Sequence, residues 1–257
     1  MISPLKFIDL FAGIGGFRLA FEAYGARCVF ASEINKFARY TYTYNHTPEN
    51  IIHWRNYDKV DEHPELYGDI REITRNKNGT PSPKKIREVI PQFDILCAGF
   101  PCPTFSVAGV SKRNSLKWKH GLEDEEKGRL IFEIAAILDA MKPPAFLLEN
   151  VKNLLSHNSG RTYQIIKNTL SEIGYNPITE EVFDAALIVP QHRERVFIAG
   201  FREDLNIDFN ISTVKVEDRH PKLKNILFNN RDVPDLYTLS DHLWGYLQKY
   251  KKKHRNA

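Results

Sequence analysis

The sequence predicts an α/β protein with an open, largely parallel, twisted sheet and helices on both faces. Three observations lead to this class. Short apolar runs alternate with segments of helical periodicity along the first 200 residues, which is typical of strands joined by crossover helices. A glycine-rich turn follows the first apolar run directly. The 257 residues, 42% of them hydrophobic, are enough to bury a large core, which excludes a disordered chain.

The expected elements follow this alternation. The predicted strands are residues 6–10, 27–31, 93–98, 145–148, 181–183 and 196–201. The predicted helices between them are residues 16–24, 35–44, 129–141 and 162–173. In the last helix, Tyr163, Ile166 and Leu170 recur at i, i+3 and i+7, which predicts one apolar stripe against the sheet. Residues 76–83 are dense in turn-forming residues, so we expect a surface loop there.

The alternation loosens after residue 201, where Pro221 and Pro234 interrupt a polar connector. A final amphipathic helix is predicted from Ser240, a good N-cap residue, with Leu243 and Tyr246 on one face. We therefore expect two parts, a ligand-binding domain over residues 1–202 and a connector with a terminal helix over residues 203–257.

Composition narrows the location and the class of site. No stretch approaches the roughly 20 apolar residues of a membrane-spanning helix, and the first residues do not resemble a signal peptide, so we expect a cytoplasmic protein without membrane contact. Cys28, Cys97 and Cys102 are odd in number and lack Cys-x2-Cys spacing, so neither a disulfide framework nor a metal site is predicted. The net charge of +4 is too small to indicate nucleic acid by itself.

Residues 7–17, FIDLFAGIGGF, combine a strand, a glycine turn and a helix start, the place where α/β sheets bind cofactors. Glu33 ends the next strand, 17 residues after Gly16, where a carboxylate can accept both hydroxyls of a ribose. Asp69 can serve an adenine amino group in the same way. The third glycine of a pyrophosphate fingerprint is missing, so an adenosine ligand without a diphosphate fits better, and S-adenosylmethionine is the obvious candidate.

A candidate nucleophile follows a later strand. Cys102 stands between two prolines at the end of the segment FDILCAGFPCP, residues 93–103. Because proline fixes φ, the thiol is expected to be held rigidly at the mouth of the sheet. Cys97 lies within the apolar run and is expected to be inert core. A purely structural cysteine beside prolines is the alternative interpretation of Cys102.

Two further motifs accompany this cysteine. Glu149 follows the apolar run of residues 145–148, at the same carboxyl edge of the expected sheet. Arg193 and Arg195 alternate at the start of another strand, so both are expected to point to one face. Individually, Glu149 could be a helix N-terminal acid and the arginines a surface ion-pair ladder. Together, and in this order, the motifs indicate a catalytic site.

This combination resembles the bacterial type of the 5-methylcytosine DNA methyltransferase family, over roughly residues 5–202. The resemblance implies a Rossmann-like fold of S-adenosylmethionine-dependent methyltransferases. A departure is Pro103-Thr104, where most members carry a glutamine after the cysteine. The motifs that carry the resemblance are residues 7–17, Glu33, Asp69-Ile70, Pro101-Cys102, Glu149-Asn150-Val151, and Gln191, Arg193 and Arg195. The cofactor-binding residues that it implies are Asp9, Phe11, Gly13, Gly15, Gly16, Glu33, Ile34, Asp69, Ile70 and Pro101.

The resemblance also implies a mechanism without metal, in which S-adenosylhomocysteine is the product. Cys102 would add to carbon 6 of a cytosine flipped out of double-stranded DNA, and Glu149 would hydrogen-bond the ring. Arg193 would orient the base, while Arg195 would brace Glu149. Residues 102–127 would close over the base and meet phosphates. Such an enzyme belongs to a restriction-modification system.

The family's target recognition domain and its returning C-terminal segments do not appear in residues 203–257. We therefore expect a complementing polypeptide, and the chain is either one subunit of a split enzyme, or the product of a truncated gene or a fragment of a longer protein. Two other functions stay open, an RNA cytosine methyltransferase and a cofactor-binding scaffold that is inactive without its partner. The missing third glycine disfavours a nicotinamide dehydrogenase.

Overall fold

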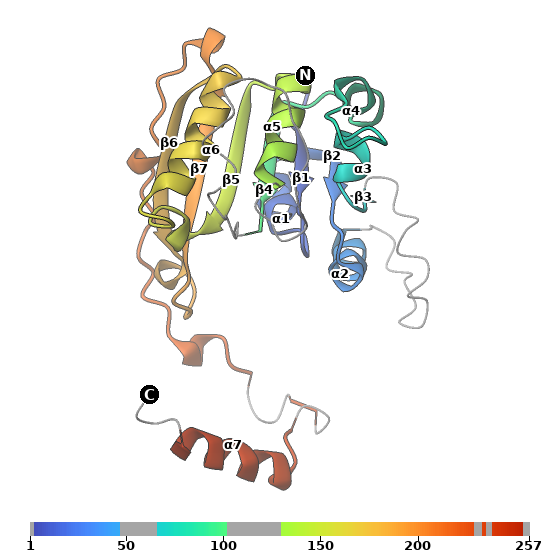
Figure 1. Ribbon diagram of the computed structural model, residues 1–257. Helices are drawn as coiled ribbons and strands as arrows, with labels where there is room; N and C mark the ends of the chain where they lie inside the picture. The colour runs from blue at the N-terminus through green and yellow to red at the C-terminus, as the bar shows by residue number, and fades with distance from the viewer. Residues whose placement is uncertain (1–2, 47–65, 102–129, 229–232, 235–237, 254–257) are drawn as a thin grey trace. The chain divides into compact units, whose positions relative to one another are not determined.

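The computed structural model describes residues 3–46, 66–101, 130–228, 233–234 and 238–253. The strands are β1 (Lys6–Leu10), β2 (Arg27–Ser32), β3 (Leu66–Tyr67), β4 (Ile95–Gly99), β5 (Ala145–Val151), β6 (Tyr175–Asp184) and β7 (Glu194–Arg202). They form one sheet in the order β3-β2-β1-β4-β5-β7-β6 (Figure 1).

The sheet is parallel over most of its width. β1 pairs in parallel with β2 and β4, β2 with β3, and β4 with β5. Only β7 runs against its neighbours, β5 and β6. The predicted fold class is confirmed. Because parallel strands end at the same edge of a sheet, the segments that follow β1, β2, β4 and β5 meet at one edge, where α/β proteins bind ligands.

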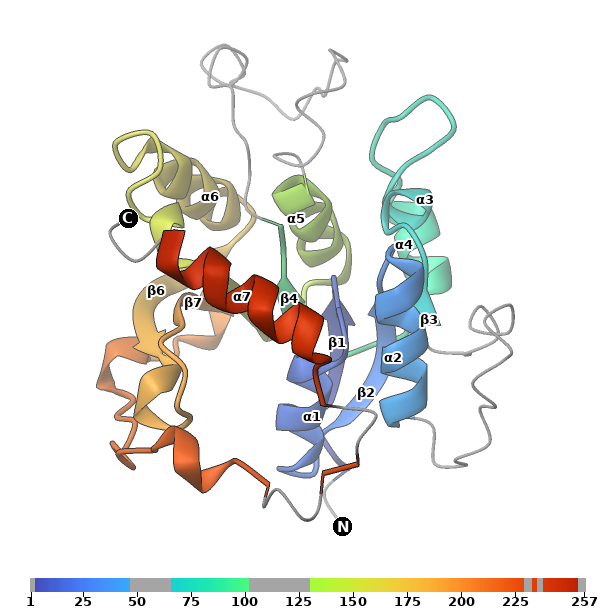
Figure 2. The same ribbon diagram turned by 90° about the horizontal axis from the view of Figure 1, so that it is seen from below.

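Helices cover both faces. They are α1 (Gly16–Glu22), α2 (Lys36–His46), α3 (Arg71–Thr74), α4 (Pro83–Val89), α5 (Leu130–Met141), α6 (Arg161–Glu172) and α7 (Asp241–Lys253). Ile73, Ile134 and Ile166, from α3, α5 and α6, belong to one buried cluster. Tyr42 of α2 belongs to a second, against which Phe17 of α1 packs. Figure 2 shows α5 and α6 on one side of the sheet and α1 on the other.

The differences from the expected elements have local causes. β3, α3 and α4 are only 2, 4 and 7 residues long, too short for hydrophobic periodicity to predict. β6 begins at Tyr175, six residues before the expected strand. Pro177 lies in this first part, where the pairing with β7 shifts register between Tyr175 and Ile178. Proline cannot donate to a strand ladder, so local sequence does not favour a strand that includes Pro177.

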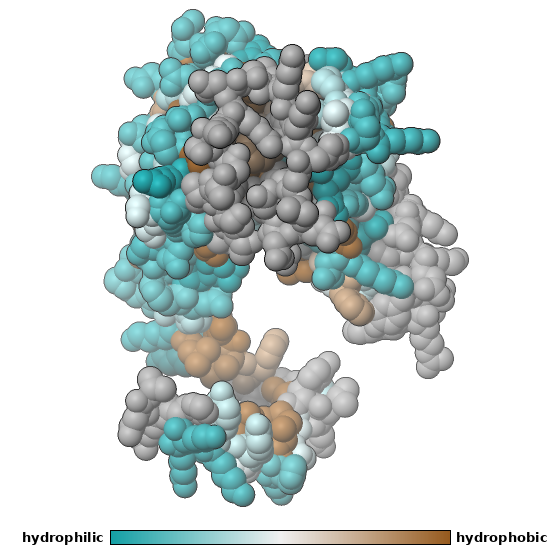
Figure 3. All heavy atoms as spheres, in the orientation of Figure 1, coloured by the Kyte–Doolittle hydropathy of each residue, from teal (hydrophilic) through white to brown (hydrophobic). Residues whose placement is uncertain are grey.

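Contacts divide the chain into two compact units, Met1–Asp184 with Arg193–Val216, and Ala185–His192 with Glu217–Ala257. The first unit contains the sheet. The second contains two short 3-10 helices, η6 (Ala185–Leu187) and η9 (Leu223–Asn225), and α7. In it, the backbone N–H of Arg219 donates to the carbonyl of Leu187 at 2.9 Å. Its residues 223–228 expose four large apolar side chains, visible as brown atoms in Figure 3.

No helix within the described ranges combines the length and the apolar character that crossing a membrane demands.

Candidate active site

The glycine turn lies at the carboxyl end of β1 and leads into α1. Phe11, Gly13 and Gly15 have φ values of 55°, 56° and 92°, a region that glycine occupies without steric cost. The turn is tied down because the Ala12 N–H donates to the carbonyl of Ser32 at 2.9 Å. A Cβ added at Gly13 or at Gly16 would meet no atom within 4 Å, so open space lies over both residues. The turn therefore has room for a ligand to approach its backbone.

Glu33 follows β2 and reaches across to this turn. Its Oε2 accepts a hydrogen bond from the N–H of Gly13 at 2.8 Å, and its Oε1 accepts one from the N–H of Asn35 at 2.7 Å. Each carboxylate oxygen has a second lone pair available for a ligand hydroxyl. The carboxylate and the open glycine turn are thus brought together, an arrangement that fits the sugar of an adenosyl group.

Exposed apolar side chains occur close to Glu33 in the sequence and in the glycine turn. Ile34 and Phe37 are 65% and 72% exposed, and Ile14 of the glycine turn is 59% exposed. Large apolar groups with this exposure offer a surface for a flat ring. Phe37 was not singled out in the sequence. Helix geometry could have indicated its exposure. Phe37 lies five residues before the fully buried Tyr42 in α2, so the two side chains lie on different faces of the helix.

Asp69 lies between β3 and α3 and is engaged by a neighbouring arginine. Burial alone would raise the pKa of Asp69, but hydrogen bonds from the Arg71 side chain and backbone outweigh burial and lower it. The Arg71 N–H and Nε donate to Oδ1 at 2.9 Å and 3.0 Å. The carboxyl is therefore an ionised acceptor. Ile70 is 3% exposed and its side chain packs in the core.

Asp9, expected at the cofactor, has a fully buried side chain in β1. Burial raises the pKa of Asp9 to about 8, against the opposing effect of the Arg18 backbone and charge, and Glu33 raises it further. Its neighbours across the strands are Ala31 and Cys97. Burial also raises the pKa of the Cys97 thiol, and Cys97 is 0% exposed, so it is the buried core residue that the sequence predicts.

The raised pKa of Asp9 predicts a pH dependence of stability. Between pH 4 and pH 8 the folded protein keeps a proton that an unfolded aspartate has lost, so the free energy of unfolding falls as the pH rises through this range. The slope from this group is at most about 1.4 kcal/mol per pH unit. Asp9→Asn should remove it, and urea unfolding of both proteins at pH 5, 6.5 and 8 measures the difference. Equal pH slopes in the two proteins would contradict the prediction.

The segment after β4 is held by a buried amide. The Nδ2 of Asn150, which is 2% exposed, donates to the carbonyl of Phe100 at 2.9 Å. Pro101 is exposed at the end of this segment. Cys102 and the rest of the expected loop to residue 127 lie outside the described residues. Asn150 is a positioning group that the sequence did not single out for this contact, because the pairing spans 50 residues.

Glu149 and Arg195 meet at the same edge. The Nε of Arg195 lies 2.8 Å from Oε1 of Glu149, and the two side chains are 22% and 25% exposed. A Cβ built on Gly99, the register partner of Glu149, would lie 3.4 Å from Oε2. The Glu149 carboxylate therefore lies directly against Gly99 at the end of β4, three residues before Cys102. A carboxylate that is partly shielded from water and fixed by an arginine can hydrogen-bond a ligand in one orientation.

Arg193 takes a different position from Arg195. It precedes the first residue of β7, its side chain is exposed, and its N–H donates to Oδ1 of Asp184 at 3.0 Å. Of the four expected catalytic residues, the structure brings Glu149 and Arg195 into contact.

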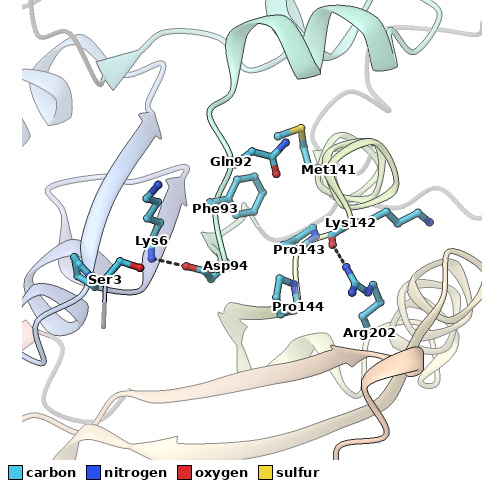
Figure 4. Close-up of a pocket in the computed structure, with 11 residues that line it drawn as sticks. Ser3, Lys6, Gln92, Phe93, Asp94, Met141, Lys142, Pro143, Pro144 and Arg202 are labelled. Atoms are coloured by element: carbon cyan, nitrogen blue, oxygen red, sulfur yellow. Dashed lines mark hydrogen bonds between the residues drawn. The ribbon is translucent and has the colours of Figure 1, made fainter. Parts of the chain in front are cut away.

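The hollow drawn in Figure 4 lies at the other edge of the sheet. It is lined by Lys6 at the start of β1, Asp94 just before β4 and Pro144 just before β5. None of the expected site residues lines it. The candidate site is therefore located by converging side chains at the carboxyl edge. No cluster of three metal-ligating side chains occurs in the part of the chain that the structure describes.

Comparison with known proteins shows the family of this chain. Residues 5–257 match the family described as C-5 cytosine-specific DNA methylase. The DNA-cytosine methyltransferase of Escherichia coli K12 is 42% identical over an alignment 264 residues long, which covers 97% of this chain and 54% of that protein. The type II methyltransferase M.HhaI of Haemophilus parahaemolyticus is 37% identical over 91% of this chain and 60% of that protein. The chain thus spans about half the length of the curated relatives it matches.

Solved structures agree on the fold. A crystal structure of a Spodoptera frugiperda DNMT2 mutant superimposes with a TM-score of 0.60 at 22% identity, over 90% of this chain and 61% of that chain. The S. pombe Dnmt2 methyltransferase gives a TM-score of 0.56 at 18% identity, over 89% and 60%. At these identities the likeness shows the fold alone.

Proposed function

Since the chain belongs to the C-5 cytosine-specific DNA methylase family, we propose that it transfers a methyl group from S-adenosylmethionine to carbon 5 of cytosine in double-stranded DNA. The observation that carries the proposal is the Glu149–Arg195 pair against Gly99, at the sheet edge where Glu33 meets the glycine turn. The type II methyltransferases among the relatives favour a role in a restriction-modification system.

The carboxyl edge supplies the groups that S-adenosylmethionine requires. Glu33 would accept the ribose hydroxyls, Asp69 the adenine amino group, and the open backbone at Gly13 would admit the chain that carries the sulfonium. Ile34 and Phe37 would flank the adenine ring. When bound, the cofactor supplies the methyl group from a positively charged sulfonium. The product that leaves this site would be S-adenosylhomocysteine.

Catalysis would begin at Cys102, whose thiolate adds to carbon 6 of cytosine and so makes carbon 5 nucleophilic. A free thiol is only about 3% ionised at neutral pH, so a nearby cation or helix N-terminus is expected to favour the thiolate. Glu149, protonated or sharing a proton, would donate to ring nitrogen 3 and accept from the exocyclic amine as charge develops. After methyl transfer, loss of the carbon 5 proton and departure of the thiolate restore the enzyme.

The two arginines would have separate tasks. Arg195 would keep the Glu149 carboxylate in place through the 2.8 Å contact. Arg193 would orient the base through its oxygen 2. The base must leave the duplex to reach this site, at a cost of a few kcal/mol, and residues 102–127 would close over it and contact phosphates.

The matched length supports a proposal about partners. The chain corresponds to 54% of the Escherichia coli relative. We propose that sequence-specific methylation also requires target recognition and the remaining family segments, supplied by a complementing polypeptide or by a longer form of this chain. In this proposal, residues 1–202 are the catalytic cofactor-binding domain, and residues 203–257 are the connector and hinge helix leading to target recognition.

Methyl transfer from labelled S-adenosylmethionine tests the function. Duplex DNA and transfer RNA are offered to the chain alone and to the chain mixed with the recognition-bearing polypeptide. We expect label on cytosine in DNA, with strong stimulation by the second polypeptide. Label found only on transfer RNA would contradict the proposal and indicate an RNA cytosine methyltransferase instead. If the chain binds cofactor but transfers no methyl group to DNA or to transfer RNA, even in the mixture, the enzyme proposal would give way to that of a cofactor-binding scaffold.

Glu33→Gln tests the cofactor site separately. Losing the charge should weaken S-adenosylhomocysteine binding by about 10- to 100-fold, because hydrogen bonds to a charged acceptor contribute about 1.5–3 kcal/mol. Calorimetry measures the dissociation constant. Glu88→Gln, an exposed carboxylate on α4, is the matched control and should bind like the wild type. Unchanged affinity in Glu33→Gln would contradict the assignment.

A further inference from the structure

The glycine turn of the first unit rests on the last turn of α2. The imidazole of His46 lies so close that a Cβ added to Gly15 would meet its Nε2 at 2.0 Å and its Cδ2 at 2.7 Å. One residue earlier, Nδ2 of Asn45 donates a hydrogen bond to the carbonyl of Ile14 at 3.5 Å. Two consecutive residues of α2 therefore touch two consecutive residues of the turn.

The position of the His46 ring is itself determined by buried neighbours. Its centroid lies 4.7 Å from the ring of Tyr42, one helical turn earlier, and Tyr42 is 0% exposed. The Tyr42 hydroxyl accepts a hydrogen bond from Arg18 of α1 at 3.4 Å and lies 3.8 Å from the Cys28 thiol of β2. His46 is thus supported through Tyr42 by α1, which follows the cofactor turn, and by β2.

The ring fills the space beside Gly15, and its surroundings favour the neutral imidazole. Burial and then the Arg18 charge lower the pKa of His46, while the carbonyls of Ile14 and Gly15 and the Glu22 carboxylate oppose them. Its buried Nε2 has no hydrogen-bond partner among the described residues. Phenylalanine keeps the planar ring and most of its volume, so it can replace histidine here with little change in packing.

We propose that His46 is a positioning residue for the cofactor turn, whose ring fills the space beside Gly15 and holds the turn in the backbone conformation that admits the adenosyl group. The inference rests on the proposed cofactor site. It extends that site to the C-terminal turn of α2, whereas the proposed cofactor site uses only Phe37, near the start of this helix.

Binding of S-adenosylhomocysteine to the full chain tests this role by calorimetry. His46→Ala leaves the turn without support, so we expect the dissociation constant to rise about tenfold, because the turn is no longer preorganised. His46→Phe restores the ring and should stay within about twofold of the wild type. Tyr44→Ala, an exposed aromatic residue on the same helix, is the matched control and should bind normally. If His46→Ala does not fold, His46→Asn replaces it in the comparison.

A double-mutant cycle separates direct positioning from general stability. Gly15→Ala should weaken binding strongly, because its Cβ meets His46 and its φ of 92° disfavours alanine. Removing the His46 ring relieves the steric clash but leaves the unfavourable φ of residue 15. In the Gly15→Ala background, His46→Ala should therefore leave affinity unchanged or improve it, opposite to its effect in the wild type.

The outcomes are distinct for the two proposals. Failure of the wild type to bind S-adenosylhomocysteine would overturn the cofactor site and this inference with it. Normal binding by the wild type together with unchanged affinity in folded His46→Ala, or additive effects in the cycle, would overturn the inference and leave the proposed function standing. A loss in His46→Phe equal to that in His46→Ala would also overturn it.

Discussion

Replacing Cys102 by serine is expected to abolish methyl transfer while cofactor affinity stays close to that of the wild type. A serine hydroxyl is almost never ionised at neutral pH and cannot add to carbon 6 as a thiolate does, so we expect a loss of about 10⁴-fold or more in single-turnover rate. Labelled-methyl transfer measures the rate, and calorimetry with S-adenosylhomocysteine measures the affinity.

Cys97→Ala is the control for this substitution. Cys97 is 0% exposed in β4, and burial keeps its thiol protonated, so its removal should leave the rate per folded molecule unchanged. Methyl transfer by Cys102→Ser at the wild-type rate would refute the nucleophile assignment.

Glu149→Gln should have the second largest effect. The amide keeps the size of the carboxylate but cannot shift a proton toward the ring, so we expect a loss of about 10²- to 10⁴-fold in rate. Cofactor affinity should change by less than about threefold, because Glu149 lies at β5 and the proposed ribose acceptor follows β2. Single-turnover transfer to DNA and calorimetry give the two quantities.

Glu194→Gln controls for the loss of a carboxylate at this edge. Glu194 neighbours Arg195 in sequence and pairs with Lys152 at 2.6 Å. Its substitution should leave the rate near that of the wild type. A Glu149→Gln variant that binds cofactor poorly but transfers methyl groups at a normal rate would overturn the proposed role.

The order and class of the main elements follow from local pattern. β1 is predicted to the residue, and β2, β4, β5 and β7 start or end within three residues of expectation, because each is a run of apolar residues bounded by turns. β3 and α3 escape prediction because elements of 2 and 4 residues have no periodicity and are stabilised by the sheet and core around them.

Contacts at the site were partly predictable. Placing Glu33 and Glu149 at strand ends required only the assumption of parallel strands, which the pairing of β1, β2, β4 and β5 confirms. The support from Asn150 to Phe100 and from His46 to Gly15 could not be read from spacing. Both depend on how far-separated segments pack, and neither residue type at those positions indicates its partner.

The most direct measurement uses a DNA duplex in which 5-fluorocytosine replaces the target base, incubated with S-adenosylmethionine, the chain and the recognition-bearing polypeptide. Fluorine cannot leave as a proton does, so the adduct with the thiolate should persist. The account predicts a covalent protein–DNA complex whose cross-linked peptide contains Cys102, lost in Cys102→Ser and strongly reduced in Glu149→Gln. A complex attached through another residue, or methyl transfer to ordinary DNA with no trapped complex, would contradict it.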